Sequence, residues 1–511
     1  MSNLTRNKIL SLFIVLTTIL AGFTFLVKDT QILFLPLTLL IVSSVCLLVV
    51  IRDMTQTKHS LLRNYPLIGR LRWVFEHERS KIQQYFIEND TNGTPYSREK
   101  RSDVYQKAKK EINTTPFGTQ LDVYEKGYEF VRHSLYPKDH NTLNEPRVHI
   151  GSKFCSQPYN ASIFNVSAMS YGALSDAAVR AINGGAKIDK FFQNTGEGGL
   201  SQYHLENGGD ICFQIGTGYF GAGKTIDGKR YFDETEFKKN ALLNKSVKLI
   251  EIKLSQGAKP GHGGILPAKK NTPEIASIRG VEPGVDVMSP PFHTAFNNPT
   301  EMLRFVKKLR QLSGGKPIGI KMCVGDEGEV KELIETMKKT NTYPDFITID
   351  GGEGGTGAAP LVFTNSIGTP LIDALIFVDK QLKLNGLRDQ VRIIASGKAS
   401  NSFDIIKLIA LGADCVNAAR AFMLSLGCIQ ARECNKNTCP VGIATQNKSL
   451  IKGLDPTEKK VRVANYHNGV IHEVKEVLGA MGLTSTEQLK PEHIFVRLDK
   501  NKITNYKELS L

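Results

Sequence analysis

Phe346-Ile-Thr-Ile-Asp350-Gly-Gly-Glu-Gly-Gly-Thr-Gly357 is the stretch of sequence that decides the fold of this chain. Four apolar or β-branched residues lead into Asp350, and five of the seven residues after it are glycine. A short, continuous apolar run predicts a strand buried on both faces, as in a parallel sheet. Glycines directly after such a strand predict a loop whose backbone can approach a ligand closely.

Other short apolar runs repeat this arrangement along the chain, and amphipathic stretches such as 175–186 and 402–411 lie between several of them. Eight parallel strands alternating with helices predict an α/β fold, a (β/α)8 TIM barrel. A doubly wound open sheet is the alternative, but no G-x-G-x-x-G follows an early strand. The candidate strands are Ser162–Met169, Phe191–Thr195, Leu249–Leu254, Val285–Met288, Ile318–Met322, Phe346–Asp350, Val391–Ser396 and Cys415–Ala418.

Glycine-containing loops follow five of these strands. Barrel active sites are built from the loops at the carboxyl ends of the strands, often with a phosphate held after the seventh and eighth. Glycines there let backbone N–H groups reach an anion, so the pattern predicts a phosphate-bearing cofactor. The loops are Met169–Gly172, Gly196–Gly199, Leu254–Gly264, Asp350–Gly357 and Ser396–Lys398.

Three charged residues stand at the predicted rim. Lys321 and Lys253 each lie near the end of an apolar run, where a cation stabilises negative charge developing on a flavin ring or a substrate carbonyl. The alternative is a structural ion pair, for Lys321 with a carboxylate such as Glu353. Glu197, between glycines, is a candidate proton relay or a salt-bridge partner.

Cys428, Cys434 and Cys439 follow a C-x5-C-x4-C spacing, and Pro440 comes next. Thiolates are soft ligands, and this spacing suits an iron–sulfur cluster. With three nearby thiolates, a three-iron cluster fits better than a four-iron cluster or a zinc site, which would need a fourth. Three reduced thiols on a surface loop are the alternative. The other five cysteines are scattered, unlike a secreted disulfide framework.

The N-terminal region contains two uncharged apolar stretches, at about 9–27 and 32–51. Each is long enough to cross a bilayer as a helix, which predicts a transmembrane hairpin. Basic residues flank the hairpin on both sides, among them Arg6, Lys8 and Arg52. The positive-inside rule then predicts a multi-pass protein of the cell membrane, with two spans and the catalytic domain on the cytoplasmic side.

The predicted domains are a hairpin over 1–54, a helical collar over 55–150, a barrel over 151–485 that includes the cysteine loop 428–446, and a C-terminal extension over 486–511. Within the collar, helices are expected at about 73–89 and 97–110. The net charge is +15. No nucleic-acid-binding motif accompanies this excess. We therefore expect a membrane surface, rather than a nucleic acid, as the partner of the N-terminal part of the positive charge, and simple solvation of the rest.

Several of these motifs together resemble the FMN-binding synthase domain of glutamate synthase, over roughly residues 110–480. The cysteine loop, with its Cys-Pro-Val-Gly-Ile-Ala-Thr-Gln ending at Gln446, is the most specific part. The hairpin and collar resemble those of a short, membrane-anchored bacterial branch, the FMN-binding glutamate synthase family proteins. The other motifs that carry the resemblance are Gly196–Gly199, Gln256–Gly264, Pro290–His293 and Gly351–Pro360.

The resemblance implies a barrel that holds FMN beside a 3Fe-4S cluster. It implies Cys428, Cys434 and Cys439 as cluster ligands, and Lys321 as a catalytic residue near the flavin and 2-oxoglutarate. Glu197 and Lys253 are catalytic candidates because of their place at the predicted rim. The cofactor-binding residues that it implies are Met169, Ser170, Tyr171, Gly172, Gln256, Lys321, Gly351, Gly352, Ser396, Gly397, Ala419 and Arg420.

The chemistry implied by the resemblance is the formation of L-glutamate by flavin-mediated reduction of the imine of 2-oxoglutarate and ammonia, with electrons arriving through the cluster. The large glutamate synthases begin with a catalytic cysteine and this sequence begins with a hairpin, so we expect no use of glutamine within the chain. A separate electron donor, ferredoxin or a reductase subunit, is expected. The alternatives are a reductase of another imine or keto substrate and a non-catalytic membrane redox or assembly module.

Overall fold

The structure is a computed structural model that describes residues 2–111 and 114–509. It divides into two compact units, one ending at Asn89 and the other beginning at Asp90. Each unit is described by itself below.

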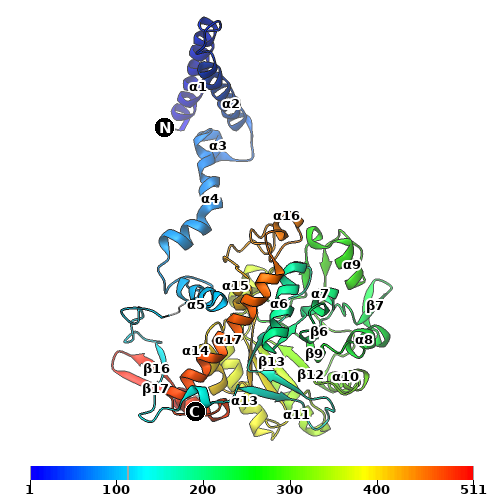
Figure 1. Cartoon of the computed structure of the whole chain (residues 1–511). Coiled ribbons are helices and arrows are strands. Elements are labelled where there is room, and N and C mark those ends of the chain that lie inside the picture. The colour runs from blue at the N-terminus through cyan, green and yellow to red at the C-terminus, as the bar shows by residue number, and fades with distance from the viewer. Residues whose placement is uncertain (1, 112–113, 510–511) are drawn as a thin grey trace. The chain divides into compact units, whose positions relative to one another are not determined.

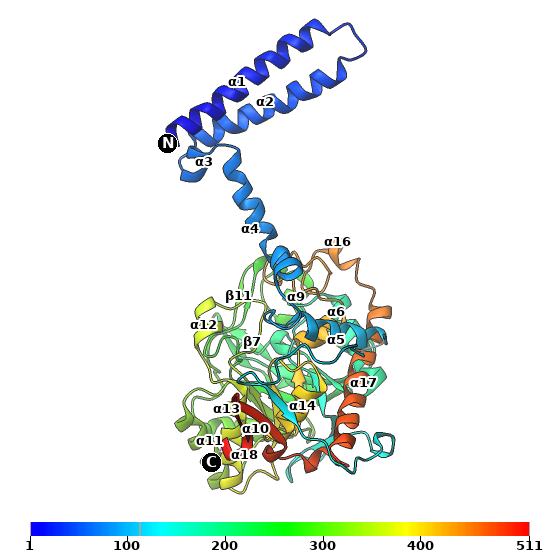
Figure 2. The same ribbon diagram turned by 90° about the vertical axis from the view of Figure 1, so that its left-hand side faces the viewer.

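The first unit is built on a helical hairpin. Helices α1 (Ser2–Leu26) and α2 (Phe34–Thr55) run side by side in opposite directions, as Figure 2 shows. The hydroxyl groups of Thr17 and Ser43 join them by a hydrogen bond of 2.7 Å. Both helices are long and apolar enough to cross a membrane by length and composition. The unit continues with α3 (Ser60–Asn64), η1 (Ile68–Arg70), α4 (Leu71–Ile82) and η2 (Gln83–Ile87).

The second unit contains a closed barrel of parallel strands with helices around it, as predicted (Figure 1). Neighbouring strands pair in the order β12-β13-β14-β15-β4-β5-β6-β9. The strands are β4 (Phe164–Val166), β5 (Phe192–Asn194), β6 (Asp210–Ile215), β9 (Val247–Lys253), β12 (Ile318–Met322), β13 (Phe346–Asp350), β14 (Arg392–Ser396) and β15 (Cys415–Ala418).

One predicted barrel strand is wrong. Of the run 285–288, only β11 (Val287–Met288) is a strand, and it pairs antiparallel with β10 (Ile265–Leu266) outside the barrel. Met288 is 74% exposed, so this run never had two buried faces. The eighth barrel strand is instead β6. Its apolar pattern is interrupted by Gln214, whose side-chain amide donates a hydrogen bond to Glu251 inside the barrel.

Helices cover the barrel because each presents an apolar face to the strands. Many begin at a residue whose side chain accepts a backbone N–H of the first turn, as Ser175 does for α6 and Asn401 for α14. The surrounding helices are α6 (Asp176–Asp189), α8 (Glu234–Ala241), α10 (Pro299–Leu312), α11 (Glu327–Thr340), α13 (Leu371–Leu384), α14 (Ser402–Ala410), α15 (Arg420–Ser425) and α17 (Pro456–Ala480).

The amino ends of the strands are covered by the hairpin of β2 (Arg147–Ile150) and β3 (Tyr159–Ser162). Tyr159 donates a hydrogen bond of 2.9 Å to Asp210, the first residue of β6, and its ring contacts Phe192. The remaining elements are α5 (Arg98–Lys109), β1 (Glu129–Val131), η3 (His140–Thr142), η4 (Gly196–Gly198), α7 (Gln202–Leu205), β7 (Gly223–Ile226), β8 (Lys229–Phe232), η5 (Ala268–Lys270), α9 (Pro273–Arg279), α12 (Leu361–Ser366), α16 (Lys448–Ile451), η6 (Thr486–Gln488), η7 (Pro491–His493), β16 (Ile494–Asp499), β17 (Lys502–Asn505) and α18 (Tyr506–Leu509).

A carboxylate lies in the middle of the barrel. Glu251 of β9 is fully buried. Its Oε1 accepts hydrogen bonds from the side-chain amides of Asn194, at 2.8 Å, and Gln214, at 2.6 Å. Its Oε2 accepts one from the hydroxyl of Thr348 at 2.6 Å. Strands β5, β6, β9 and β13 are thereby joined through one side chain, and a fully bonded buried carboxylate of this kind rigidifies the core.

Candidate active site

Loops at the carboxyl ends of the strands meet at one mouth of the barrel. The loop after β9 crosses the loop after β13, where Gly257 N donates 2.9 Å to Asp350 and a Cβ on Gly257 would lie 1.7 Å from Gly351 O. The loop after β5 touches the loop after β4, because a Cβ on Gly196 would lie 2.7 Å from Ser170 N. Glycine is required at both crossings since no side chain fits between the two backbones.

Glu197 and Lys253 form an ion pair at this mouth, with Lys253 Nζ 2.7 Å from Glu197 Oε1. Gly216 and Gly264 surround the carboxylate so closely that a Cβ on either would lie within 2.6 Å of its oxygens. Burial opposes ionisation of Glu197, but the charge and hydrogen bond of Lys253 outweigh it and lower the pKa of this carboxyl. Glu197 is therefore an anion at neutral pH.

Lys321 is the penultimate residue of β12, and its Nζ lies 3.4 Å from Asp350 Oδ2. Burial disfavours its charge, but Asp350 and, next in size, Glu251 raise its pKa above the ordinary value. The anticipated alternative partner, Glu353, is directed elsewhere and accepts the backbone N–H of Leu371 at 3.0 Å. Lys321 is thus a permanent buried cation, and its structural partner is the aspartate of its neighbouring strand.

Two further cations at the mouth were not singled out from the sequence. Arg279, the last residue of α9, is 5% exposed and donates to Tyr171 O at 3.2 Å. Its Nε has no hydrogen-bond partner within residues 2–111 and 114–509. Lys259 is 3% exposed, and burial together with the charge of Lys253 lowers its pKa to about 8. A lysine in a glycine loop and an arginine at a helix end look ordinary in sequence, so only the fold reveals them.

The loop after β4, Met169–Gly172, approaches the mouth through its backbone more than through its side chains. Tyr171 is directed away from the barrel axis and donates 2.8 Å to Glu274 of α9. Met169 is 9% exposed, and Gly172 has a φ of +100°, which favours glycine. Ser170 Oγ lies 3.4 Å from Arg279. Gln256, from the loop after β9, is half-buried between Lys253 and the Gly257 crossing.

The predicted phosphate-binding residues lie at the ends of β13, β14 and β15. Gly351 N donates 3.0 Å to Ser396 O, and Gly352 N donates 2.8 Å to Thr369 O. A Cβ on Gly397 would lie 2.7 Å from Leu371. The backbone N–H groups of Gly351 and Gly352 are thus already bonded to carbonyls within the protein and are not free for a phosphate. Ala419 precedes α15, and the guanidinium of Arg420 donates 3.3 Å to Glu353 O.

The cysteine loop packs on the same mouth. Gln446, at its end, donates to Gly172 O at 3.1 Å and to Leu174 O at 2.8 Å. Lys270 joins the same two segments, since its Nζ donates to Ala173 O and Ala444 O. A Cβ on Gly357 would lie 3.8 Å from Cys434 Cβ, so the glycine loop after β13 touches this loop. The two motifs predicted to bind cofactors are neighbours.

The three thiols of this loop influence one another electrostatically. Burial raises the pKa of Cys428 to about 11, and the electrostatic influence of Cys434 and Cys439 adds to it. Burial and Cys439 likewise raise the pKa of Cys434, while Lys270 opposes the shift. All three are free cysteines, and none is exposed. Mostly buried, unbridged thiols beside a lysine fit thiolate ligation, because a bound metal would remove their protons and Lys270 would offset the charge.

Comparisons with known proteins agree on one family. The family described as "Conserved region in glutamate synthase" matches residues 102–484. The chain is 38% identical over 499 residues to the glutamate synthase large subunit-like protein YerD of Bacillus subtilis, covering 90% of this chain and 94% of that protein. It is also 38% identical to the archaeal glutamate synthase [NADPH] of Methanocaldococcus jannaschii, over 64% of this chain and 60% of that protein. A glutamate synthase [NADPH] large chain of Bacillus subtilis is 33% identical over 334 residues, which cover 64% of this chain and 20% of that protein.

Proposed function

Because this chain belongs to the glutamate synthase family, we propose that it forms L-glutamate by reducing the imine of 2-oxoglutarate and ammonia. It is an oxidoreductase of the glutamate synthase type. The matched region spans 60% of the archaeal relative and 20% of the large chain.

The observation that carries the proposal is the excess of buried cations at the mouth. Lys253 and Lys321 have carboxylate partners in Glu197 and Asp350. Arg279 keeps an unpartnered Nε among the described residues, and burial lowers its pKa to about 10, which still leaves it charged at neutral pH. Together with Lys259 it offers positive charge that a dicarboxylate substrate would neutralise. A buried charge of this kind is costly unless it is paired.

Both cofactors fit the residues present. FMN would be held by the loops at the carboxyl ends of β4, β13 and β14, which include Met169–Gly172, Gly351 and Ser396–Gly397, and a 3Fe-4S cluster by the three cysteines of the 428–446 loop. When bound, the flavin supplies two-electron reduction and the cluster supplies one-electron delivery from a separate donor, a ferredoxin or a reductase subunit.

The protein's own part is to bind, orient and protect the substrate. Arg279 and Lys259 would hold its carboxylates, and Lys321 would stabilise negative charge developing beside the ring. Glu197 is ionised, so its role is to keep Lys253 charged and in place rather than to donate a proton at neutral pH. Close loop crossings at Gly257 and Gly196 would exclude water, which otherwise hydrolyses the imine.

Membrane attachment is part of the proposal. The apolar hairpin of α1 and α2, with Arg6 and Arg52 near its two ends, supports an anchor that leaves the barrel on the cytoplasmic side. Carbonate extraction of membranes, followed by protease treatment of inside-out and right-side-out vesicles, tests it. Release by carbonate, or protection of the barrel in inside-out vesicles, would exclude this topology.

The deciding experiment uses full-length protein purified without oxygen. We expect one FMN, three irons and four sulfides per chain. After reduction, 2-oxoglutarate with ammonium should restore the absorbance of oxidised flavin and release L-glutamate, while either alone should not. Reoxidation by a different keto acid with an amine would point to another substrate. Protein without flavin would exclude the redox function altogether.

A further inference from the structure

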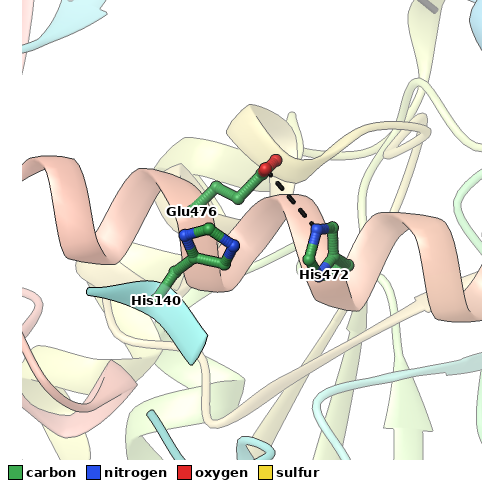
Figure 3. A group of neighbouring side chains, drawn as sticks. All are labelled: His140, His472 and Glu476. Atoms are coloured by element: carbon green, nitrogen blue, oxygen red, sulfur yellow. Dashed lines mark ion pairs between the residues drawn. The ribbon is translucent and has the colours of Figure 1, made fainter. Parts of the chain in front are cut away.

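A cluster of metal-binding side chains lies outside the candidate active site. His472 and Glu476 stand one turn apart on α17, and His140 reaches them from η3 (Figure 3). One ligand atom from each of the three lies within 4.8 Å of the other two. The two imidazole rings are 5.2 Å apart between centroids, and His472 Nε2 is 3.5 Å from Glu476 Oε1.

The backbone holds His140 against α17. Ser134 N donates to Ala480 O, and Lys138 N donates to Gly479 O, both at 2.8 Å. Gly479 lets the segment lie this close, since a Cβ there would sit 2.6 Å from Lys138 O. The third ligand is therefore positioned by main-chain contacts that do not depend on a metal, and a preorganised site loses less entropy on binding.

The kind of ligand decides the kind of metal. Two imidazoles and one carboxylate suit a late first-row divalent ion such as Zn²⁺, whereas Mg²⁺ and Ca²⁺ prefer oxygen ligands alone. Tetrahedral zinc would need the ligand atoms about 3.3 Å apart, given bonds of about 2.0–2.1 Å. Rotation about side-chain bonds can bring the ligand atoms from within 4.8 Å to this shorter spacing. The side chains of His472 and Glu476 have room to rotate, because they are 54% and 48% exposed.

We propose that His140, His472 and Glu476 form a second metal site, which binds Zn²⁺ or a similar divalent ion and leaves a coordination position to water. The ion would join the segment before the barrel to the long helix that follows it. The site is independent of the proposed glutamate chemistry.

The test is zinc binding to full-length holoenzyme, washed with a mild chelator and dialysed against Zn²⁺ at pH 7.5. The variants are His140→Asn and His472→Asn, with His133→Asn as the matched control because it removes an exposed histidine of the same segment. We expect one zinc ion per chain in the parent and the control, and at least about tenfold weaker binding in both site variants.

The cysteine loop is the competing zinc site, and X-ray absorption at the zinc edge separates the two. A nitrogen and oxygen shell at about 2.0–2.1 Å supports the histidine site, whereas sulfur at about 2.3 Å assigns the ion to the thiols and overturns the proposal. Equal zinc affinity in the parent and both variants would also overturn it, as would the absence of binding by the parent. Iron and flavin content should be unchanged in all variants, which shows that they fold.

Discussion

Lys253 Nζ lies 2.7 Å from Glu197 Oε1, and this contact joins the end of β9 to the loop that follows β5. The pair brings together residues that are far apart in the chain, and glycines at 216 and 264 leave no other room for the carboxylate. The ion pair fixes one positive and one negative charge at the mouth of the barrel.

Glu197→Gln should lower turnover by about 10²-fold, because it leaves Lys253 unpaired and disturbs the charges that stabilise the transition state. The pKa of Glu197 is depressed in the folded protein. The stability that the ionised carboxylate contributes is therefore fully present above its unfolded pKa, and it is lost only as the pH falls through the folded pKa. Parent activity should therefore show no titration of Glu197 near pH 7. Steady-state rates between pH 6 and 8 check this, and an unchanged rate in the variant would contradict it.

Substrate affinity should depend on Lys259 in mild alkali. Its pKa of about 8 means that it is charged below this pH and neutral above it. If it holds a substrate carboxylate, KM for 2-oxoglutarate should rise as the pH passes from about 7 to 9, with little change in kcat. Lys259→Met should raise KM below about pH 8, where the parent lysine is charged, and remove this dependence. A parental pH profile in the variant would rule out the role.

Lys321→Met should abolish most turnover while flavin stays bound through the other loops. Its pKa is raised, so no pH in the working range neutralises it in the parent. We expect a loss of about 10² to 10³-fold in kcat. Lys316→Met is the control, since Lys316, just before β12, is also buried and its Nζ donates to the backbone carbonyls of Ala241 and Asn244. Equal losses in the two variants would indicate a general effect of removing a buried lysine.

Replacing Glu251 should reduce stability more than it alters ligand binding. Glu251→Leu leaves the donors of Asn194, Gln214 and Thr348 without an acceptor, which should cost about 3 kcal/mol or more. Glu251→Gln keeps an acceptor and should cost less. The midpoint of thermal inactivation measures both. Similar midpoints for the two variants would mean that the hydrogen bonds contribute little.

Cys434→Ser should remove most of the bound iron, because serine does not replace a soft thiolate ligand. Cys155→Ser is the matched control, as its thiol lies outside the cysteine loop and contacts Gly315 O. Iron and sulfide analysis with electron paramagnetic resonance follows the cluster, and flavin absorbance follows FMN. Full iron content in the Cys434 variant would remove this residue from the proposed ligands.

Local patterns predicted much of this molecule because they report local physics. Apolar runs such as 346–350 have the length of a buried strand, and the glycines after them are required where two backbones cross. The spacing of the three cysteines places them on one loop whatever the rest of the fold does. The expected helices at about 73–89 and 97–110 correspond to α4 with η2 and to α5 for the same reason, since helix formation depends on neighbouring residues.

The amino-acid sequence by itself thus determined the barrel, its glycine-rich loops and the cysteine motif. Only the tertiary structure decided which charges meet. It paired Lys321 with Asp350 rather than Glu353, brought Arg279 to the mouth, enclosed Glu251, and chose β6 over 285–288 as a barrel strand. The physical reason is that ion pairs, burial and strand partners join residues distant in the chain, and their energies depend on positions that exist only after the barrel closes.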